Sequence, residues 1–437
     1  MFLITNNPGI KSSDIPGFLI ISEKSIEFYY YPYPLYFAFK NGFYYISDNI
    51  NKIRENILSK PSFDGVLQLL LFNCNFYPYS IFENIIPIHP YTRIYDYSKK
   101  PIFKKIQKQN EKISKEEFFV ELDNILLENT YNDYSKYLLF SGGLDSSLIK
   151  HYIKKNILFG TTLYDDITKN ECYEILNLHD NVIFLKNDKN AFFEVFKNTV
   201  FVFPFINAGY IDDRMHVLNA FKNNTQLIYT GTGADELLGD YNFVNFNNIK
   251  LNPEWFSKNV CYSLFADLKS YLPFEKVSEI FCNSIQWFDF ENKKNKIDFI
   301  VNSFLIPNQN ALMSNNVYDI EYIERVNPFV SQRFFDLCNG ISEYLCENNF
   351  IEKYVLKEFA KTKGFYSLSM RSSRDFDYRG DLNYSESFEK YIIDNVNLFE
   401  LFDNYKFLSN LNSFSKDTKI KLSIFLKILK DFSLGNK

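Results

Sequence analysis

The sequence predicts an α/β protein: a parallel, doubly wound sheet with a helical C-terminal layer, preceded by a small, mainly β region. Three observations carry this prediction. Short apolar runs alternate with helical patterns over residues 137–230, which is typical of a parallel sheet. Aromatic and β-branched runs broken by turn residues fill residues 18–46, which indicates strands and hairpins. Beyond Tyr241, apolar residues recur at three- and four-residue spacing, which indicates helices.

Length and composition exclude several classes of protein. The 437 residues suffice for two or three domains, and a net charge of −5 argues against a nucleic-acid partner held by phosphate contacts. The six cysteines form no C-x-x-C pair and the four histidines no H-x-x-x-H pair, so neither a disulfide framework nor a zinc site is expected. We see no signal peptide and no apolar stretch of about 18 residues, so we expect a cytoplasmic protein without a membrane partner.

The first part of the chain reads as a small domain. Besides the strands at 18–46, residues 67–71 form an apolar helical patch. Charged residues become dense between Lys99 and Glu117, as in a solvated linker that leads into a helix. We therefore place a domain boundary there and predict domains at 1–110 and 111–437.

The most informative stretch is residues 137–153. A short apolar run ends at Phe140, the string SGGLDSS follows from Ser141, and an apolar pattern with helical spacing begins after Ser147. A strand, a Gly/Ser turn and a helix start place free N–H groups and the positive end of a helix dipole at one spot, which favours phosphate binding. A plain helix cap is the simpler interpretation of Asp145 and its serines. The string also lacks the Gly-Lys-Ser/Thr ending of a Walker loop.

The pattern after this loop alternates between strands and helices. Strands are expected at 157–163, 182–185 and 227–230, and helices at 169–178, 191–202 and 215–221. In parallel sheets of this kind, ligands bind at the carboxyl ends of the strands. Both Ser141 and Gly231 would lie at such ends.

A second motif, GTGADELLGDY, begins at Gly231, directly after a predicted strand. Alone it could be a tight loop that caps the next helix. With SGGLDSS about 90 residues earlier, it resembles the paired motifs of the N-type ATP pyrophosphatases. Within that group the chain is most similar to the synthetase domain of asparagine synthetases and their relatives, the β-lactam synthetases and lasso-peptide cyclases.

This resemblance implies ATP and Mg²⁺ as cofactors. Asp145 and Asp235, one from each motif, are the expected magnesium ligands, and Mg²⁺ does prefer a few carboxylates together with phosphate oxygens. The resemblance also implies the following phosphate- and nucleotide-binding residues: Phe140, Ser141, Gly142, Gly143, Leu144, Asp145, Ser146, Ser147, Thr230 and Gly231.

The N-terminal part resembles a shortened glutaminase domain of the same family. Residues 34–37, 42–48 and 81–96 are similar to segments late in that domain and occur in the family's order. Active glutaminases of this family carry a nucleophilic cysteine at the mature N-terminus. Here position 2 is Phe2 and the nearest cysteine is Cys74. The resemblance therefore implies a degenerate domain of the N-terminal-nucleophile type, and glutamine is not the expected nitrogen donor.

Three candidate catalytic residues follow from later segments. Residues 324–330 resemble the family string E-V-R-V-P-F-L-D, which makes Glu324 the expected base, although a helix that ends before Pro328 fits the same residues. Thr232 replaces the glutamate of asparagine synthetases and the tyrosine of β-lactam synthetases. Ser373 replaces a lysine that the family uses in amide formation, and the adjacent Arg374 is the candidate substitute. Residues 351–358 match another family string, and 420–428 predict an amphipathic helix.

Together these features predict an ATP-dependent, AMP-forming amide synthetase that adenylates a carboxylate and joins it to an amine without glutamine hydrolysis. The expected substrate is a specialised carboxylate, such as a precursor peptide closed to a lasso-type macrolactam, with a protease as a possible partner protein. An ammonia-dependent asparagine synthetase is one alternative. An inactive nucleotide-binding subunit is the other, because Thr232 and Ser373 depart from the family pattern.

Overall fold

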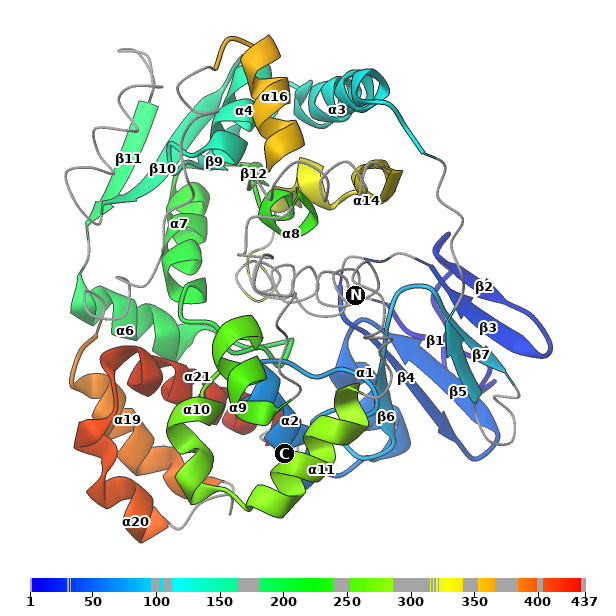
Figure 1. Ribbon diagram of the computed structural model, residues 1–437, viewed down its shortest axis with the longest axis vertical. Coiled ribbons are helices and arrows are strands. Elements are labelled where there is room, and N and C mark those ends of the chain that lie inside the picture. Colours follow the sequence, from blue (N-terminus) through cyan, green and yellow to red (C-terminus); the bar gives the residue numbers. More distant parts are fainter. Residues whose placement is uncertain are drawn as a thin grey trace.

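The computed structural model is a mixed α/β structure with a five-stranded parallel sheet and a smaller antiparallel β region (Figure 1). It describes residues 2–29, 31, 33–95, 102–105, 112–163, 181–186, 188–238, 252–261, 263–285, 315, 317, 320, 322–340, 353–365, 384–398 and 404–433. None of the helices in these ranges is both long and apolar enough to cross a membrane.

The parallel sheet has the strand order β11-β10-β9-β12-β13. Its strands are β9 (Lys136–Leu139), β10 (Ile157–Leu163), β11 (Asn181–Lys186), β12 (Leu227–Tyr229) and β13 (Glu324–Val326). The first four confirm the predicted strands. The chain builds one half of the sheet outward from β9 to β11 and then returns to place β12 on the other side of β9. The direction of the connections therefore reverses between β9 and β12.

The fifth strand, β13, shows that one interpretation of its sequence was wrong. A helix that ends before Pro328 was one interpretation of this segment, but the structure shows a strand parallel to β12 followed by a 3₁₀ helix at Pro328–Val330. Proline at the start of that short helix needs no backbone N–H there.

Helices pack on both faces of the parallel sheet. Residues of α3 (Lys115–Thr130), α4 (Leu144–Tyr152), α14 (Gln332–Gly340) and α16 (Tyr354–Thr362) share one buried cluster with Leu138 and Tyr229. On the other face, Val217 and Ala220 of α7 (Tyr210–Lys222) pack against Tyr137 and Ile228. Almost every residue of β9 and β12 is buried, which is what a sheet covered on both faces requires.

One predicted helix is shorter in the structure than expected. The helix expected at 191–202 is α6 (Lys189–Asn198), which ends early because Thr199 is extended and its hydroxyl donates to the Val195 carbonyl at 2.9 Å. The helix expected at 169–178 lies outside the described residues. The charged segment before 117 leads into α3 as expected, and Ser114 and Glu117 form a capping box there.

The antiparallel region consists of two four-stranded sheets, β1-β5-β4-β6 and β2-β3-β7-β8, with ten of their residues buried in one cluster. It confirms the strands and hairpins predicted at 18–46, and α2 confirms the helix at 67–71. Its elements are β1 (Ile4–Thr5), β2 (Leu19–Ile21), β3 (Ser25–Phe28), β4 (Leu35–Lys40), β5 (Phe43–Ser47), α1 (Ile50–Ile57), α2 (Phe63–Phe72), β6 (Ile85–Ile88), β7 (Thr92–Tyr95) and β8 (Ile102–Lys105).

The part of the chain beyond 241 is helical apart from β13 where it is described, as predicted, and the pattern at 420–428 lies within α21. Its remaining helices are α9 (Pro253–Phe256), a π-helix (Ser257–Cys261), α10 (Phe265–Leu268), α11 (Phe274–Ile285), α19 (Ser387–Asn395), α20 (Asn404–Ser409), α21 (Lys416–Ser433) and 3₁₀ helices at Lys269–Tyr271, Val396–Leu398 and Leu411–Ser413. In Figure 1, α2 lies among these helices rather than apart from them.

One large buried cluster joins the two ends of the chain. It contains side chains of α1 and α2 together with side chains of α11, α19 and α21. Arg54 of α1 donates to the carbonyl of Phe432 in α21, and its guanidinium lies 4.6 Å from the ring centre of Phe82. The cluster therefore spans the boundary expected near residue 110.

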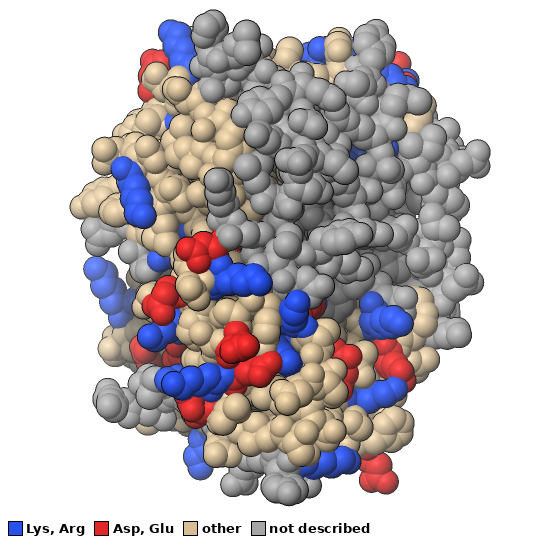
Figure 2. Space-filling model, turned by 90° about the vertical axis from the view of Figure 1, so that its left-hand side faces the viewer, with Lys and Arg blue, Asp and Glu red and all other residues tan. Residues whose placement is uncertain are grey.

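The surface that Figure 2 shows has no single sign of charge over its described lower part. Acidic and basic side chains are interspersed there, as the net charge of −5 leads one to expect.

Candidate functional site

The two motifs meet where the connections of the parallel sheet reverse. β9 and β12 are neighbours, with Leu138 opposite Tyr229, so the loops that begin at Phe140 and Thr230 leave the sheet at the same level. Strand order and register thus bring together segments that lie 90 residues apart in the sequence. This is the position at which open parallel sheets bind ligands.

The first loop presents the start of α4. Gly143 is the N-cap of this helix and, as a glycine, has no side chain to cap the N–H groups of the first turn. The Ser141 hydroxyl accepts a hydrogen bond from the Gly143 N–H at 3.2 Å, while the Ser146 hydroxyl donates to the Gly143 carbonyl at 3.2 Å. The loop is therefore held in shape by its own serines, with the positive end of a helix dipole facing outward.

The predicted nucleotide-binding residues differ in exposure. Ser141 is exposed, and Gly143, Asp145 and Gly231 are partly exposed. Buried members of the set are Phe140, Gly142, Leu144, Ser146, Ser147 and Thr230. Phe140 packs edge-on against Phe159 at 5.4 Å. The buried side chains shape the loop, so a ligand there would be contacted by the exposed and partly exposed residues and by the backbone.

Gly231 lets the two loops touch. A Cβ atom at this position would lie 2.9 Å from the Cβ of Asp145, closer than real carbon atoms approach. Two residues on, Gly233 has a φ of +102° and faces the Phe329 carbonyl, which a Cβ atom would approach to 2.3 Å. Gly231 and Gly233 are therefore needed for close packing against α4 and against the segment after β13.

Lys353 joins the two expected magnesium ligands. Its ammonium lies 2.7 Å from Asp145 Oδ2 and also forms an ion pair with Asp235 Oδ1. The Lys353 side chain is only 10% exposed and that of Asp145 15% exposed. Lys353 has left-handed backbone geometry and directly precedes α16. No role is predicted for Lys353 from the sequence, although it lies in the string at 351–358 that resembles a family segment.

The aspartate pair fits a magnesium ion. Because Asp145 and Asp235 both contact one ammonium, their oxygens converge on a point that a single cation can reach. Among the described residues no group of three or more His, Cys, Asp or Glu side chains could hold a metal by itself. Two carboxylates completed by phosphate oxygens and water are the usual protein site for Mg²⁺.

The candidate catalytic residues differ in what the structure shows of their positions. Thr232 lies in the second loop, with its hydroxyl 2.7 Å from that of Thr230 and its N–H donating to the same oxygen at 3.2 Å. Arg374 and Ser373 lie outside the described residues.

Glu324 is not brought to the two loops. It is exposed and pairs with Leu227 and, across β12, with Lys136, at the amino ends of these strands. The carboxyl edge is four residues further along, about 13 Å at 3.3 Å per residue. The position expected from the family string therefore does not place a base beside the loop that begins at Ser141.

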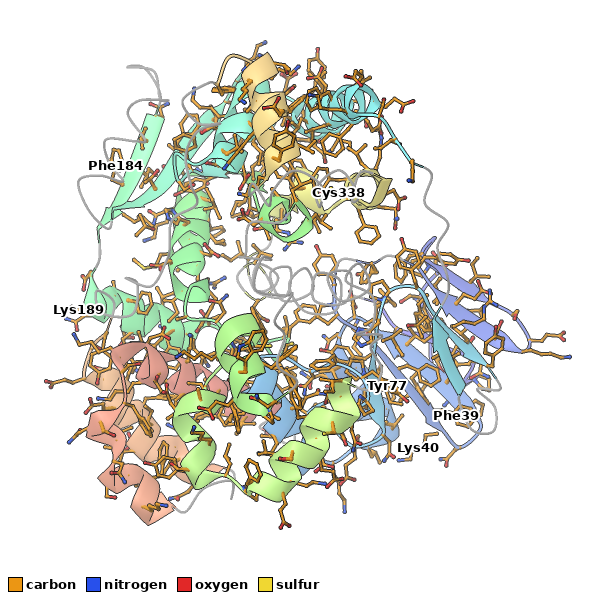
Figure 3. All side chains as sticks on the ribbon, in the orientation of Figure 1. Phe39, Lys40, Tyr77, Phe184, Lys189 and Cys338 are labelled. Atoms are coloured by element: carbon orange, nitrogen blue, oxygen red, sulfur yellow. The ribbon has the colours of Figure 1, made fainter. Side chains whose placement is uncertain are left out.

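Two further groups bear on the chemistry. His216 of α7 is buried between the hydroxyls of Tyr137 at 2.9 Å and Thr162 at 2.8 Å, and burial lowers its pKa to about 4. Burial also raises the pKa of the Cys338 thiol on α14 (Figure 3). The neutral His216 side chain thus links α7 to β9 and β10 through two hydrogen bonds. Cys338 is not a reactive thiolate.

No family model matches the chain, and no curated protein matches it either.

Proposed function

We propose that this protein is an ATP-dependent, AMP-forming amide synthetase of the asparagine-synthetase type, built on a doubly wound sheet at 111–437. The observation that carries the proposal is the convergence of Asp145, Asp235 and Lys353 beside the uncapped start of α4. Two carboxylates, one ammonium and a helix N-terminus form a site for a metal-bound polyphosphate. We further propose that residues 1–110 are a degenerate glutaminase-like domain without a nucleophile.

The reaction has two balanced steps. A carboxylate oxygen of the substrate attacks the α-phosphorus of ATP, and the bond from that phosphorus to the bridging oxygen breaks to release pyrophosphate. An amine then attacks the acyl carbon, loses a proton and displaces AMP. The amine is ammonia or a group on the substrate itself, as in a precursor peptide that closes to a macrolactam.

The residues of the site act on charge in the first step. The α4 N–H groups and Lys353 oppose the charge that develops on pyrophosphate. Mg²⁺, held by Asp145 and Asp235, would supply further neutralisation of the phosphate oxygens. Neighbouring hydroxyls of Thr230 and Thr232 offer hydrogen bonds at the same edge.

One observation favours a second candidate, a nucleotide-binding protein without amide chemistry. Glu324, the base that the resemblance implies, lies at the amino ends of the strands, whereas the two loops lie at the carboxyl ends. A protein that binds ATP but has no base for the amine would stop at binding or at the acyl-adenylate.

Nucleotide product analysis tests these proposals. Purified protein is incubated with magnesium and labelled ATP, with aspartate plus ammonium in one reaction and candidate precursor peptides in others. Peptide-dependent AMP that is lost in Asp235→Asn but kept in the surface control Asp64→Asn supports the specialised synthetase. AMP with aspartate and ammonium identifies an asparagine synthetase instead, and binding without AMP identifies the second candidate.

A further inference from the structure

The site continues along the sheet to Asn327. This residue directly follows Val326, which pairs with Tyr229, so Asn327 lies level with Thr230 at the carboxyl edge. The Thr230 N–H donates to the Val326 carbonyl at 3.3 Å, which fixes the two chains side by side. Residues level with each other on parallel strands point to the same face. Asn327 therefore lies beside the second loop, at the carboxyl end of the neighbouring strand β13.

The carboxamide of Asn327 is unusual because both of its polar atoms are buried and unpaired. Within the described part of the chain, neither Nδ2 nor Oδ1 has a hydrogen-bond partner. Buried polar atoms are normally paired, because their desolvation is costly. The family string that this segment resembles has an apolar valine directly before its proline, where this chain has Asn327. A polar side chain that costs stability in the folded protein is explained by a ligand that pairs with it.

The neighbouring groups define what that ligand offers. Thr230 and Thr232 place two hydroxyls 2.7 Å apart at this edge, and Asn327 adds one acceptor and two donors. All three side chains are uncharged, so they match a neutral amide better than an α-amino or α-carboxylate group, which needs a counter-charge.

We propose that Asn327 is a specificity-determining residue that hydrogen-bonds a neutral amide next to the reacting carboxylate. The inference rests on the proposed function and defines its substrate class as carboxylates flanked by amide groups rather than free amino acids.

The first test is the stability of the protein alone. Asn327→Leu removes two unpaired polar atoms at similar volume, so its Tm is expected to rise above that of the wild type. The matched control is Asn315, a buried asparagine whose oxygen accepts from the Val202 and Phe203 N–H groups and whose Nδ2 donates to the Phe203 carbonyl. Asn315→Leu is expected to lower the Tm. If Asn327→Leu lowers it as well, Asn327 is structural and the proposal is overturned.

The second test is binding. With magnesium and α,β-methylene-ATP present, calorimetry compares N-acetyl-L-aspartate N-methylamide, in which amides flank the carboxylate, with L-aspartate. The wild type is expected to prefer the amide probe, and Asn327→Leu to bind it about tenfold or more weakly, the loss of one good hydrogen bond. Equal binding of both probes, of neither, or no change in Asn327→Leu overturns the inference. A separate titration with the nucleotide alone tests the proposed function, and unchanged nucleotide affinity in Asn327→Leu separates the two failures.

Discussion

Lys353 is the residue on which the charge balance of the site depends, because it stands between Asp145 and Asp235. Lys353→Met would leave the largely buried carboxylate of Asp145 and the partly exposed one of Asp235 facing each other without a counter-charge. We expect this variant to lose about 3 kcal/mol of unfolding free energy in metal-free buffer. Added Mg²⁺ should restore much of that loss, since the cation then takes the place of the ammonium. Urea unfolding with and without magnesium measures both effects.

The chain offers a matched control for this variant. Lys276 also contacts two carboxylates, Asp64 at 3.1 Å and Glu279 at 3.2 Å, but its side chain is 32% exposed. Lys276→Met should cost less than about 1 kcal/mol and show no magnesium rescue, because exposed ion pairs contribute little. Equal losses in the two lysine variants would mean that Lys353 has no special relation to the aspartate pair.

His216 gives the protein a specific response to acid. Its folded pKa of about 4 lies below the ordinary value of 6.5, so the folded state binds fewer protons than the unfolded state between these values. The unfolding free energy should therefore fall as the pH drops from about 6.5 to about 4, by about 3 kcal/mol at 1.36 kcal/mol per unit. The contribution is fully present above pH 6.5. Chemical denaturation at a series of pH values measures it.

The control is His216→Gln, which keeps a polar side chain between Tyr137 and Thr162 but does not titrate. Over the same pH interval, the unfolding free energy of this variant should lack the decrease that protonation of His216 causes in the wild type. Burial raises the pKa of Asp431, which works in the opposite direction, and the difference between variant and wild type removes that background. Parallel pH profiles of the two proteins would show that His216 does not set the acid response.

At this scale the sequence predicts what is encoded locally and misses what depends on distant contacts. Ser141 and Gly231 are recognisable because strand, glycine and helix signals are contiguous. Lys353 and Asn327 carry no local signal, since their importance comes from partners on other elements or from the lack of them. Glu324 shows the converse: its string resembles a family string, but the register of β13 places it at the amino ends of the strands.

Among the elements, those with strong periodicity are predicted well and short edge strands are not. β10 has the bounds that the sequence predicts, because apolar and β-branched residues fill all seven of its positions except Gly160. β13 has three residues, Glu324–Val326, two of them charged, so only its pairing with β12 makes it a strand. A strand that forms only because a neighbouring strand pairs with it has no recognisable pattern in its own sequence.

The contact between the loop after β12 and helix α4 depends on Gly231. Gly231→Ala would place a methyl group 2.9 Å from Asp145 Cβ, which belongs to the first turn of α4 and cannot rotate away. We expect this variant to lose about 2 kcal/mol of unfolding free energy and to bind ATP more weakly, because the loops must separate. Thermal unfolding and a nucleotide titration check the two effects.

Gly17 is the control for this substitution. A Cβ atom there meets nothing within 4 Å, so Gly17→Ala should leave nucleotide affinity unchanged and stability equal or slightly higher. An ATP affinity of Gly231→Ala equal to that of Gly17→Ala would mean that the two motifs do not form one binding site.

Over the whole molecule, the two ends of the chain share one core. Besides the cluster that joins α2 to α21, Gln68 donates to the Ser284 hydroxyl at 2.9 Å and the Ile206 N–H donates to the Asn73 carbonyl at 2.9 Å. The sequence suggests separate domains because charge density peaks between them, but composition does not reveal which apolar faces pack together. The shared cluster makes the N-terminal part a structural support for the helical layer, whatever its ancestry.

A shared core predicts cooperative unfolding across the boundary near residue 110. Leu70 in α2 and Phe425 in α21 are both buried in the same cluster. Leu70→Ala and Phe425→Ala should each cost about 3 kcal/mol through the cavities they leave, and each should shift one calorimetric transition that includes both ends of the chain. The exposed Val120→Ala on α3, 64% accessible, is the control and should shift it little. Two transitions, one moved only by Leu70→Ala and the other only by Phe425→Ala, would instead show independent domains, because residues of one cooperative core cannot be destabilised separately.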